Sequence, residues 1–163
     1  MAKTAAAILA ALAAAGLAAL VALGRSPAPE DAPRDGPAAE GELVVYYSPS
    51  CGCCTEWVRY LESRAFRVRT VAVDDLERVK EEAGVPADLR ACHTALLAGY
   101  AIEGHVPAEA VAKLLQERPE GVRGIAVPGM PLGSPGMAGE LQGPLVVFSF
   151  GAGGAAAFMT LSP

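Results

Sequence analysis

Hydrophobic residues recur along this chain with two periods, one typical of strands and one typical of helices. Leu43–Tyr47 is a short run of β-branched and aromatic residues that predicts a buried strand. From Cys54 onward, apolar positions that include Trp57 and Leu61 recur at helical spacing and predict a helix of about three turns. Phe66–Val73 then alternates apolar with polar positions, which predicts a second strand. The folded region therefore opens with a strand, a helix and a strand.

The middle of the chain continues this mixture. Asp74 followed by Glu77 supplies a capping box for a helix that we expect to end at Ala83. Thr94–Leu97 and Tyr100–Glu103 flank a glycine-containing turn, so they predict a β-hairpin. The order strand, helix, strand, helix, hairpin indicates a small sheet covered by helices.

The last third of the chain combines one more helix with strands and a long loop. Pro107 occupies a favoured first-turn position of a helix with one apolar stripe that continues to Arg118. Gly124–Val127 predicts a short strand, and the glycine- and proline-rich Pro128–Pro144 predicts a loop. Leu145–Leu161 predicts a terminal hairpin with a glycine-rich turn.

The N-terminal region differs from the rest in composition. Lys3 precedes an uncharged apolar stretch, Thr4–Gly24, which is the pattern of an export signal and is also about the length that spans a bilayer. Residues 1–24 are therefore expected to be a signal peptide or an N-terminal membrane anchor. Residues 25–41 are rich in proline, alanine, glycine and charge, which predicts a disordered linker. We expect residues 42–163 to form the folded domain.

Charge and cysteine placement narrow the functional classes. The chain of 163 residues has a formal net charge of −5, which argues against nucleic acid as a partner because such proteins present a basic face. Membrane contact is expected only through the N-terminal segment. The sequence holds only four cysteines and two histidines, so their positions carry most of the chemical information.

Three of the cysteines, Cys51, Cys53 and Cys54, lie where a predicted strand passes into a predicted helix. The unpaired amides and the dipole at a helix start stabilise an anion, so thiolates are favoured there. Thiolates are also the ligands that soft metal ions prefer.

Alternative uses of these sulfurs remain open from the residues alone. Cys51 and Cys54 have the C-x-x-C spacing of dithiol oxidoreductases, in which Cys51 attacks and Cys54 resolves. Cys53 is surplus to that chemistry, and three sulfurs within four residues suit copper(I), which accepts two or three soft ligands and tolerates shared thiolates. A single tetrahedral zinc is less apt because the adjacent Cys53 and Cys54 do not both point comfortably at one ion. Structural disulfides are a third interpretation.

Other candidate ligands lie further along the chain. Cys92-His93 immediately precedes the predicted hairpin, and His105 follows it in the segment GHVP, where a structural or solvated histidine is the ordinary expectation. Met130 and Met137 lie in the loop PGMPLGSPGM; loop methionines can bind copper(I), or both can fold back over the sheet as hydrophobic plugs.

Three segments carry a resemblance to known proteins. VVYYSPSCGCCTEWVRYLES resembles the opening of a thioredoxin-like domain, and the set SPSCGCC, ACHTALLAGYAIEGHVP and AVPGMPLGSPGM is similar to the CopG-like copper-resistance family of bacteria. The resemblance implies an α/β thioredoxin-like fold with a C-terminal loop and hairpin extension, a periplasmic location and copper handling. In thioredoxins the loop before the third strand packs against the C-x-x-C pair, so Cys92-His93 is expected to face the other cysteines. The usual cis-proline of that loop is absent here, which favours metal binding over generic disulfide exchange.

The resulting hypothesis is an exported copper(I)-binding protein involved in copper resistance, with a redox role open. Cys51, Cys53, Cys54 and Cys92 would supply thiolates to one or more copper(I) ions, with His93 as a ligand or a hydrogen-bonding partner of the sulfurs. Met130, Met137 and His105 are weaker candidates. Expected partners are copper ions and a copper exporter or periplasmic copper chaperone. The alternative function is a periplasmic thiol–disulfide oxidoreductase.

Overall fold

A computed structural model describes residues 41–163, so the expected signal or anchor segment and nearly all of the expected linker lie outside the described residues. Within residues 41–163, no helix is both long and apolar enough to cross a membrane. The elements are β1 (Glu42–Tyr47), α2 (Gly52–Glu62), β2 (Arg67–Ala72), α3 (Leu76–Ala83), the 3-10 turn η2 (Ala87–Leu89), β3 (His93–Leu97), β4 (Tyr100–Glu103), α4 (Ala108–Glu117), β5 (Val122–Ala126), β6 (Leu145–Gly151) and β7 (Gly154–Leu161).

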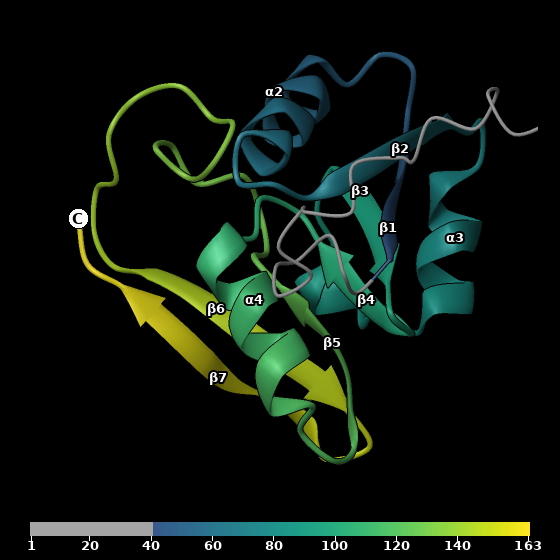
Figure 1. The fold of residues 1–163 in the computed structure, drawn as a ribbon, viewed down its shortest axis with the longest axis vertical. Helices are drawn as coiled ribbons and strands as arrows, with labels where there is room; N and C mark the ends of the chain where they lie inside the picture. The colour runs from purple at the N-terminus through teal and green to yellow at the C-terminus, as the bar shows by residue number, and fades with distance from the viewer. Residues whose placement is uncertain (1–40) are drawn as a thin grey trace, which may run out of the picture. The chain divides into compact units, whose positions relative to one another are not determined.

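The strands form one mixed sheet in the order β2-β1-β3-β4-β5-β6-β7 (Figure 1). β1 and β2 are parallel, as are β4 and β5, while the other neighbours are antiparallel. The predicted α/β fold is confirmed: a cysteine-bearing helix follows the first strand in a thioredoxin-like arrangement. The predicted C-terminal extension is also present, as the loop that follows β5 and the hairpin β6–β7.

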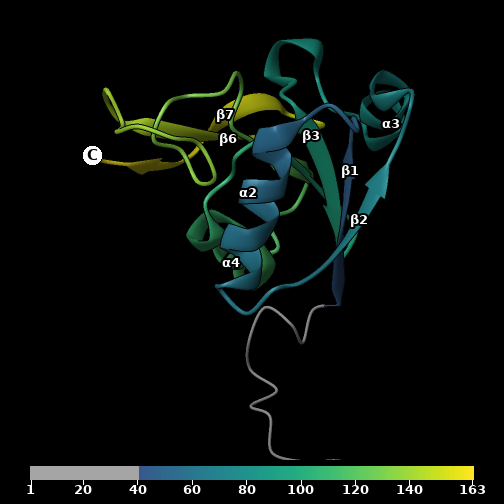
Figure 2. The ribbon, with the colours of Figure 1, turned by 90° about the horizontal axis from the view of Figure 1, so that it is seen from above.

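Helices cover both faces of the sheet. Side chains of α2 and α4 share one hydrophobic core with alternate residues of β1, β3, β4 and β5. A smaller core contains Val85, Leu89 and Phe150. α3 lies on the opposite side of the sheet from α2 and α4 (Figure 2). Trp57 of α2 is fully buried and is the largest side chain of the main core. Full burial of one large apolar side chain contributes roughly 1.5–3 kcal/mol, so α2 is held firmly against the sheet.

One predicted helix start is corrected by one residue. The cap of α3 is Asp75, whose carboxylate accepts a hydrogen bond from the backbone N–H of Arg78 at 3.0 Å, and not Asp74. A capping side chain reaches the amide two or three positions further on, and Asp74 lies one residue too early for the helix that forms. Glu77 remains in the first turn, where its charge complements the helix dipole.

The hairpin β3–β4 has the predicted turn and fixes which side chains face which helix. Ala98 and Gly99 both have positive φ, 50° and 86°, as a two-residue turn between twisted strands requires. Successive side chains of a strand point to opposite faces. His93 therefore faces α2, where its ring contacts Trp57, and Thr94 faces α3, where its hydroxyl contacts Lys80.

Candidate metal and thiol site

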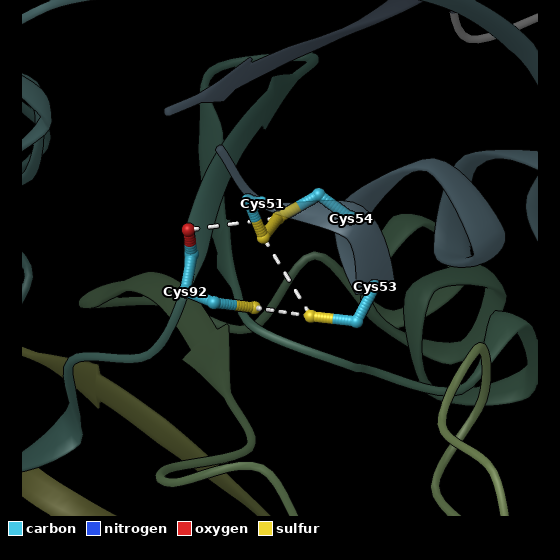
Figure 3. A group of neighbouring side chains, drawn as sticks. All are labelled: Cys51, Cys53, Cys54 and Cys92. Atoms are coloured by element: carbon cyan, nitrogen blue, oxygen red, sulfur yellow. Dashed lines mark hydrogen bonds between the residues drawn. A yellow bond between two sulfur atoms is a disulfide. The ribbon is translucent and has the colours of Figure 1, made fainter. Parts of the chain in front are cut away.

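The chain path brings all four cysteines to one end of the sheet. Cys51 is the N-cap of α2, and Cys53 and Cys54 lie in its first turn. β1 pairs with β3 so that Tyr47 lies opposite His93, which places Cys92 beside the end of β1 from which the cysteine segment continues. Figure 3 shows the four side chains converging from these two segments.

The sulfur atoms lie close enough to share metal ions. The Sγ atoms of all four cysteines lie within 4.8 Å of one another. Cys51 and Cys54 form a disulfide, which is the C-x-x-C pair of the alternative function. Cys53 Sγ lies 3.6 Å from Cys51 Sγ and 3.9 Å from Cys92 Sγ (Figure 3). The cluster thus combines one closed disulfide with two free thiols, Cys53 and Cys92.

The sulfurs differ in their exposure and acidity. Cys54 is 1% exposed, whereas the other three are partly exposed, so within the disulfide Cys51 is the more accessible sulfur. Burial, followed by the neighbouring charge of Cys53, raises the pKa of the Cys92 thiol to about 12. Cys92 is therefore a protonated thiol at neutral pH in the metal-free protein, and a metal ion must displace that proton to bind it.

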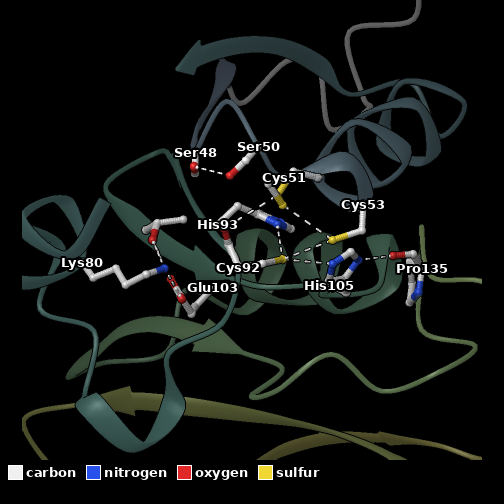
Figure 4. Close-up of a disulfide and its surroundings, with 12 residues drawn as sticks. Ser48, Ser50, Cys51, Cys53, Lys80, Cys92, His93, Glu103, His105 and Pro135 are labelled. Carbon is white, nitrogen blue, oxygen red and sulfur yellow. Dashed lines mark hydrogen bonds and ion pairs between the residues drawn. A yellow bond between two sulfur atoms is a disulfide. The ribbon is translucent and has the colours of Figure 1, made fainter. Parts of the chain in front are cut away.

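Both histidines of the chain contact the Cys92 sulfur (Figure 4). His93 Nδ1 lies 3.2 Å and His105 Nε2 lies 3.1 Å from Cys92 Sγ. The other ring nitrogen of His105, Nδ1, lies 2.7 Å from the carbonyl oxygen of Pro135. A carbonyl only accepts, so Nδ1 carries the proton and Nε2 presents its lone pair toward the sulfur. This is the arrangement in which a second hydrogen bond orients a ligating histidine.

The two imidazoles are held neutral by their surroundings. Both side chains are fully buried. Burial, with added repulsion from His105 and Lys80, lowers the pKa of His93 to about 3. Burial also lowers the pKa of His105. Neutral imidazole is the form that binds metal ions, so both rings are ready to act as ligands.

His93 also has an unsatisfied polar atom. Its ring packs against Trp57 with centroids 4.3 Å apart, and Trp57 Nε1 donates to the carbonyl of Val106 at 2.9 Å. Among the described residues, His93 Nε2 is the one buried side-chain nitrogen or oxygen without a hydrogen-bond partner. Such atoms are rare in folded proteins and call for a specific explanation.

A buried ion pair lies on the opposite face of β3. Lys80 Nζ contacts Glu103 Oε1 at 2.6 Å (Figure 4). Lys80 Nζ also donates to Thr94 Oγ1 at 3.1 Å. Glu103 also accepts from the backbone N–H of Ala91 at 2.6 Å and from the Thr94 hydroxyl at 2.6 Å. The carboxylate therefore fixes the residue immediately before Cys92.

The sequence patterns do not single out this ion pair, and they predict a structural or solvated histidine at His105. His105 is buried against Cys92, so the solvated interpretation is wrong. The predicted hairpin could have indicated the contact between His105 and Cys92. Thr94 pairs with Glu103, and the same register continued by two residues sets Cys92 opposite His105. The burial of Lys80 could have been inferred from its position on the apolar stripe of α3.

The two methionines of the long loop have different environments. Met130 is 52% exposed, so it is not a hydrophobic plug over the sheet. Met137 is partly buried, and its backbone N–H donates to the carbonyl of Ser134 at 2.8 Å. The neighbouring Gly136 packs directly on the backbone of Trp57, so this end of the loop is anchored on α2.

Comparison with known proteins gives a consistent result. The profile of a family described as "Protein of unknown function, DUF411" matches residues 89–137. A solved structure of copper resistance protein copG, form 2, is 37% identical with a TM-score of 0.69, covering 74% of this chain and 97% of that one. Form 1 is 36% identical with a TM-score of 0.69, covering 75% and 98%. Among curated proteins, none matches the sequence.

Proposed function

Because the chain belongs to the CopG family of copper resistance proteins, we propose that it handles copper by binding copper(I) at its cysteine cluster. Cys51, Cys53, Cys54 and Cys92 supply thiolates in this proposal, and His93 is a further ligand or tunes the sulfur of Cys92 through its 3.2 Å contact. The observation that carries the proposal is the convergence of the four sulfurs within 4.8 Å of one another.

The chemistry of the donors favours copper(I) over harder ions. Thiolate sulfur is a soft ligand that selects copper(I), and sulfurs this close together can be shared between neighbouring ions. No carboxylate belongs to the groups of closely spaced donors found among the described residues. A cluster of sulfur and imidazole without oxygen ligands is poorly suited to magnesium or calcium, which bind oxygen.

Loading all four sulfurs requires the disulfide to open. A dithiol reductant transfers two electrons and two protons to the bond between Cys51 and Cys54, becoming a disulfide itself and leaving two protein thiols. Copper(I) then replaces the thiol protons, so binding releases protons. Copper capacity is therefore expected to be greater in the reduced protein than in the disulfide form.

The decisive variant is Cys53→Ser. Cys53 lies between Cys51 and Cys92, at 3.6 and 3.9 Å, but takes no part in the disulfide. We expect the fully reduced variant to lose high-affinity copper(I) binding, at least about 100-fold, because the thiolate that bridges the two segments is gone. The measurement is anaerobic competition against a colorimetric copper(I) chelator, with free thiols counted beforehand.

Two controls accompany this test. Ser50→Ala changes a neighbouring hydroxyl that bonds only Ser48 among its side-chain contacts, and should leave copper(I) affinity unchanged. Cys54→Ser removes the disulfide and should also lower copper(I) affinity. Wild-type affinity in Cys53→Ser would refute the four-sulfur proposal.

The closed disulfide at the start of a helix supports a second candidate, a thiol–disulfide oxidoreductase. In that reaction a substrate thiolate attacks the more accessible Cys51, forms a mixed disulfide and releases Cys54 as a thiolate; a second substrate thiol then completes the exchange. Cys53→Ser should leave this turnover largely intact and Cys54→Ser should abolish it. High turnover together with unchanged copper(I) binding in Cys53→Ser would favour the enzyme.

We further propose that the protein works outside the cytoplasm, in the periplasm. The support is the apolar segment that follows Lys3 and precedes a proline-rich stretch. Its partners would be a copper exporter or a periplasmic copper chaperone. Cell fractionation with mass measurement of the mature chain tests the location and whether residues 1–24 are retained.

A further inference from the structure

The donor atoms of the site fall into two sets that share a single residue. One set is the four sulfurs, and the other consists of Cys92, His93 and His105, whose donor atoms also lie within 4.8 Å of one another. Closing the disulfide between Cys51 and Cys54 removes two donors from the first set and none from the second. The second set is therefore complete in the state in which the first is disabled.

From this difference we propose that Cys92, His93 and His105 form a second, overlapping binding site for one divalent cation of borderline softness, such as Zn²⁺, that operates while the disulfide is closed. This inference extends the proposed copper function: the thiol–disulfide state would decide whether the protein takes copper(I) or a divalent ion. One thiolate with two imidazoles is a donor set that zinc, cobalt(II) and copper(II) accept, whereas thiolates alone select copper(I) among the copper oxidation states.

The distances fit a single ion. With metal–sulfur and metal–nitrogen bonds of about 2.3 and 2.0–2.1 Å, a tetrahedral site separates its sulfur from each nitrogen by about 3.5 Å. The observed separations from Cys92 Sγ are 3.2 Å to His93 Nδ1 and 3.1 Å to His105 Nε2. Small outward movements of the two rings would admit the ion, with water in the fourth position.

Convergence of adjacent residues is unusual, and here a strand boundary explains it. Side chains of consecutive strand residues point to opposite faces, but Cys92 precedes β3 and His93 is its first residue. The Cys92 sulfur therefore turns toward the same side as the His93 ring, as the 3.2 Å contact records.

The surroundings of the histidines support a metal rather than a purely structural role. Pro135 fixes the tautomer of His105 so that Nε2 is free to coordinate. His93 is fully buried, and its Nδ1 is the ring nitrogen that lies 3.2 Å from the Cys92 sulfur and would coordinate.

Cobalt(II) is the appropriate probe, because it replaces zinc, does not oxidise thiols and gives absorption bands that report thiolate ligation. We expect the full-length wild-type chain, in its disulfide form and without reductant, to bind one equivalent of Co²⁺. Sulfur-to-cobalt charge-transfer absorption and two paramagnetically shifted imidazole N–H resonances should appear. Absence of either signal at saturating Co²⁺ would overturn the proposal.

The matched variants are His105→Asn and Ser50→Ala. Asparagine retains an N–H where His105 Nδ1 donates to Pro135 but lacks the Nε2 donor, so Co²⁺ affinity should fall at least about 10-fold. Ser50→Ala lies beside the cluster but belongs to neither donor set, so it should bind Co²⁺ within a few-fold of wild type. Thermal unfolding verifies that each variant is folded, and the wild-type resonances test the ligands independently of any variant.

The outcomes separate this inference from the proposed function. Copper(I) binding by the reduced wild type together with no Co²⁺ binding by the disulfide form refutes the second site and leaves the copper function intact. Co²⁺ binding by the disulfide form without copper(I) binding by the reduced form refutes the copper function alone. Wild-type Co²⁺ affinity in His105→Asn would also refute the second site.

Discussion

The two faces of β3 bury polar side chains in opposite ways. On the side of α3, Lys80, Glu103 and Thr94 are 0–1% exposed, and each polar group meets at least one partner within 3.1 Å. On the side of α2, His93 and His105 are equally buried. Yet Nε2 of His93 has no hydrogen-bond partner, and the polar group nearest to its other nitrogen, Nδ1, is the thiol of Cys92. The strand period of two sends adjacent residues to these contrasting environments.

We interpret the difference as one of role: the ion pair of Lys80 and Glu103 stabilises the fold, whereas the group of Cys92, His93 and His105 binds a ligand. A buried charge must be paired, and the ion pair with its hydrogen bonds meets that requirement within the chain. The sulfur–imidazole group carries no charge to pair, and it directs His93 Nδ1 and His105 Nε2 at the Cys92 sulfur, an arrangement that suits a bound metal ion.

The largest effect is expected from breaking the ion pair with Lys80→Met. The substitution leaves the Glu103 carboxylate buried without its cation, which should lower the free energy of unfolding by about 3–5 kcal/mol. Urea denaturation followed by circular dichroism measures this change. An effect below about 1 kcal/mol would mean that the pair is dispensable, contrary to its complete burial.

Two control variants test whether the loss of stability comes from the unpaired buried charge. Lys80→Met combined with Glu103→Gln removes both charges while the glutamine can still accept from Ala91 and donate to Thr94, so at least half of the loss should be recovered. Arg69→Met breaks an ion pair with Glu42 whose side chains are 52% and 51% exposed, and should cost less than about 1 kcal/mol.

The second prediction concerns the pH dependence of the metal-free protein. Below pH 6.5 the unfolded chain protonates His93, whereas the folded protein, with the pKa of His93 at about 3, does not. Unfolding therefore takes up a proton, and stability falls as the pH drops from about 6.5 toward 3. The slope is at most about 1.4 kcal/mol per pH unit, so about 2–3 kcal/mol is lost between pH 6.5 and 4.5.

His93→Leu isolates this contribution from that of the carboxylates. The variant has no ring to protonate at this position, so its free energy of unfolding should fall less on acidification. The difference from wild type should be most of the about 2–3 kcal/mol given above. His105, whose pKa is lowered in the same direction, retains its own contribution in both proteins. Urea denaturation at several pH values measures the two curves, and parallel curves would show that His93 is not the acid-sensitive group.

The fold was predictable because strong local patterns agreed with the tertiary arrangement. Thr94–Leu97 and Tyr100–Glu103 alternate around a two-residue turn, so their pairing followed from the sequence. The start of α3 was misplaced because Asp74 and Asp75 are both good caps, and only packing of the helix decides between them.

The site was only partly predictable. Clustering of Cys51, Cys53 and Cys54 is local, and the resemblance to thioredoxin-like domains placed Cys92 near them. The disulfide between Cys51 and Cys54 could not be predicted, because the C-x-x-C spacing allows both a disulfide and metal ligation. The burial of His105 depends on the hairpin register and on the carbonyl of Pro135, thirty residues away, and no periodic pattern encodes that contact.

The smallest predicted effect tests this dependence on a distant loop. Gly136 has φ +79°, and a Cβ there would lie 2.5 Å from the backbone nitrogen of Trp57. Gly129 has φ +70°, but a Cβ there would meet nothing within 4 Å, so it is a matched control for backbone strain alone. Gly136→Ala should therefore destabilise the protein by about 1–2 kcal/mol more than Gly129→Ala, because the loop must move off α2.

The displaced loop carries the carbonyl of Pro135 away from His105, so the substitution should also weaken the hydrogen bond of the His105 imidazole. It should leave the ion pair of Lys80 and Glu103 unchanged. In Gly136→Ala the Nδ1–H proton of His105 should exchange with solvent faster than in Gly129→Ala, and the Lys80 ammonium signal should stay unchanged, both measured by NMR. Equal exchange in the two variants would mean that the loop does not orient His105. In that case the contrast between the two faces of β3 would rest on His93 alone, since its unpartnered nitrogen does not depend on the loop.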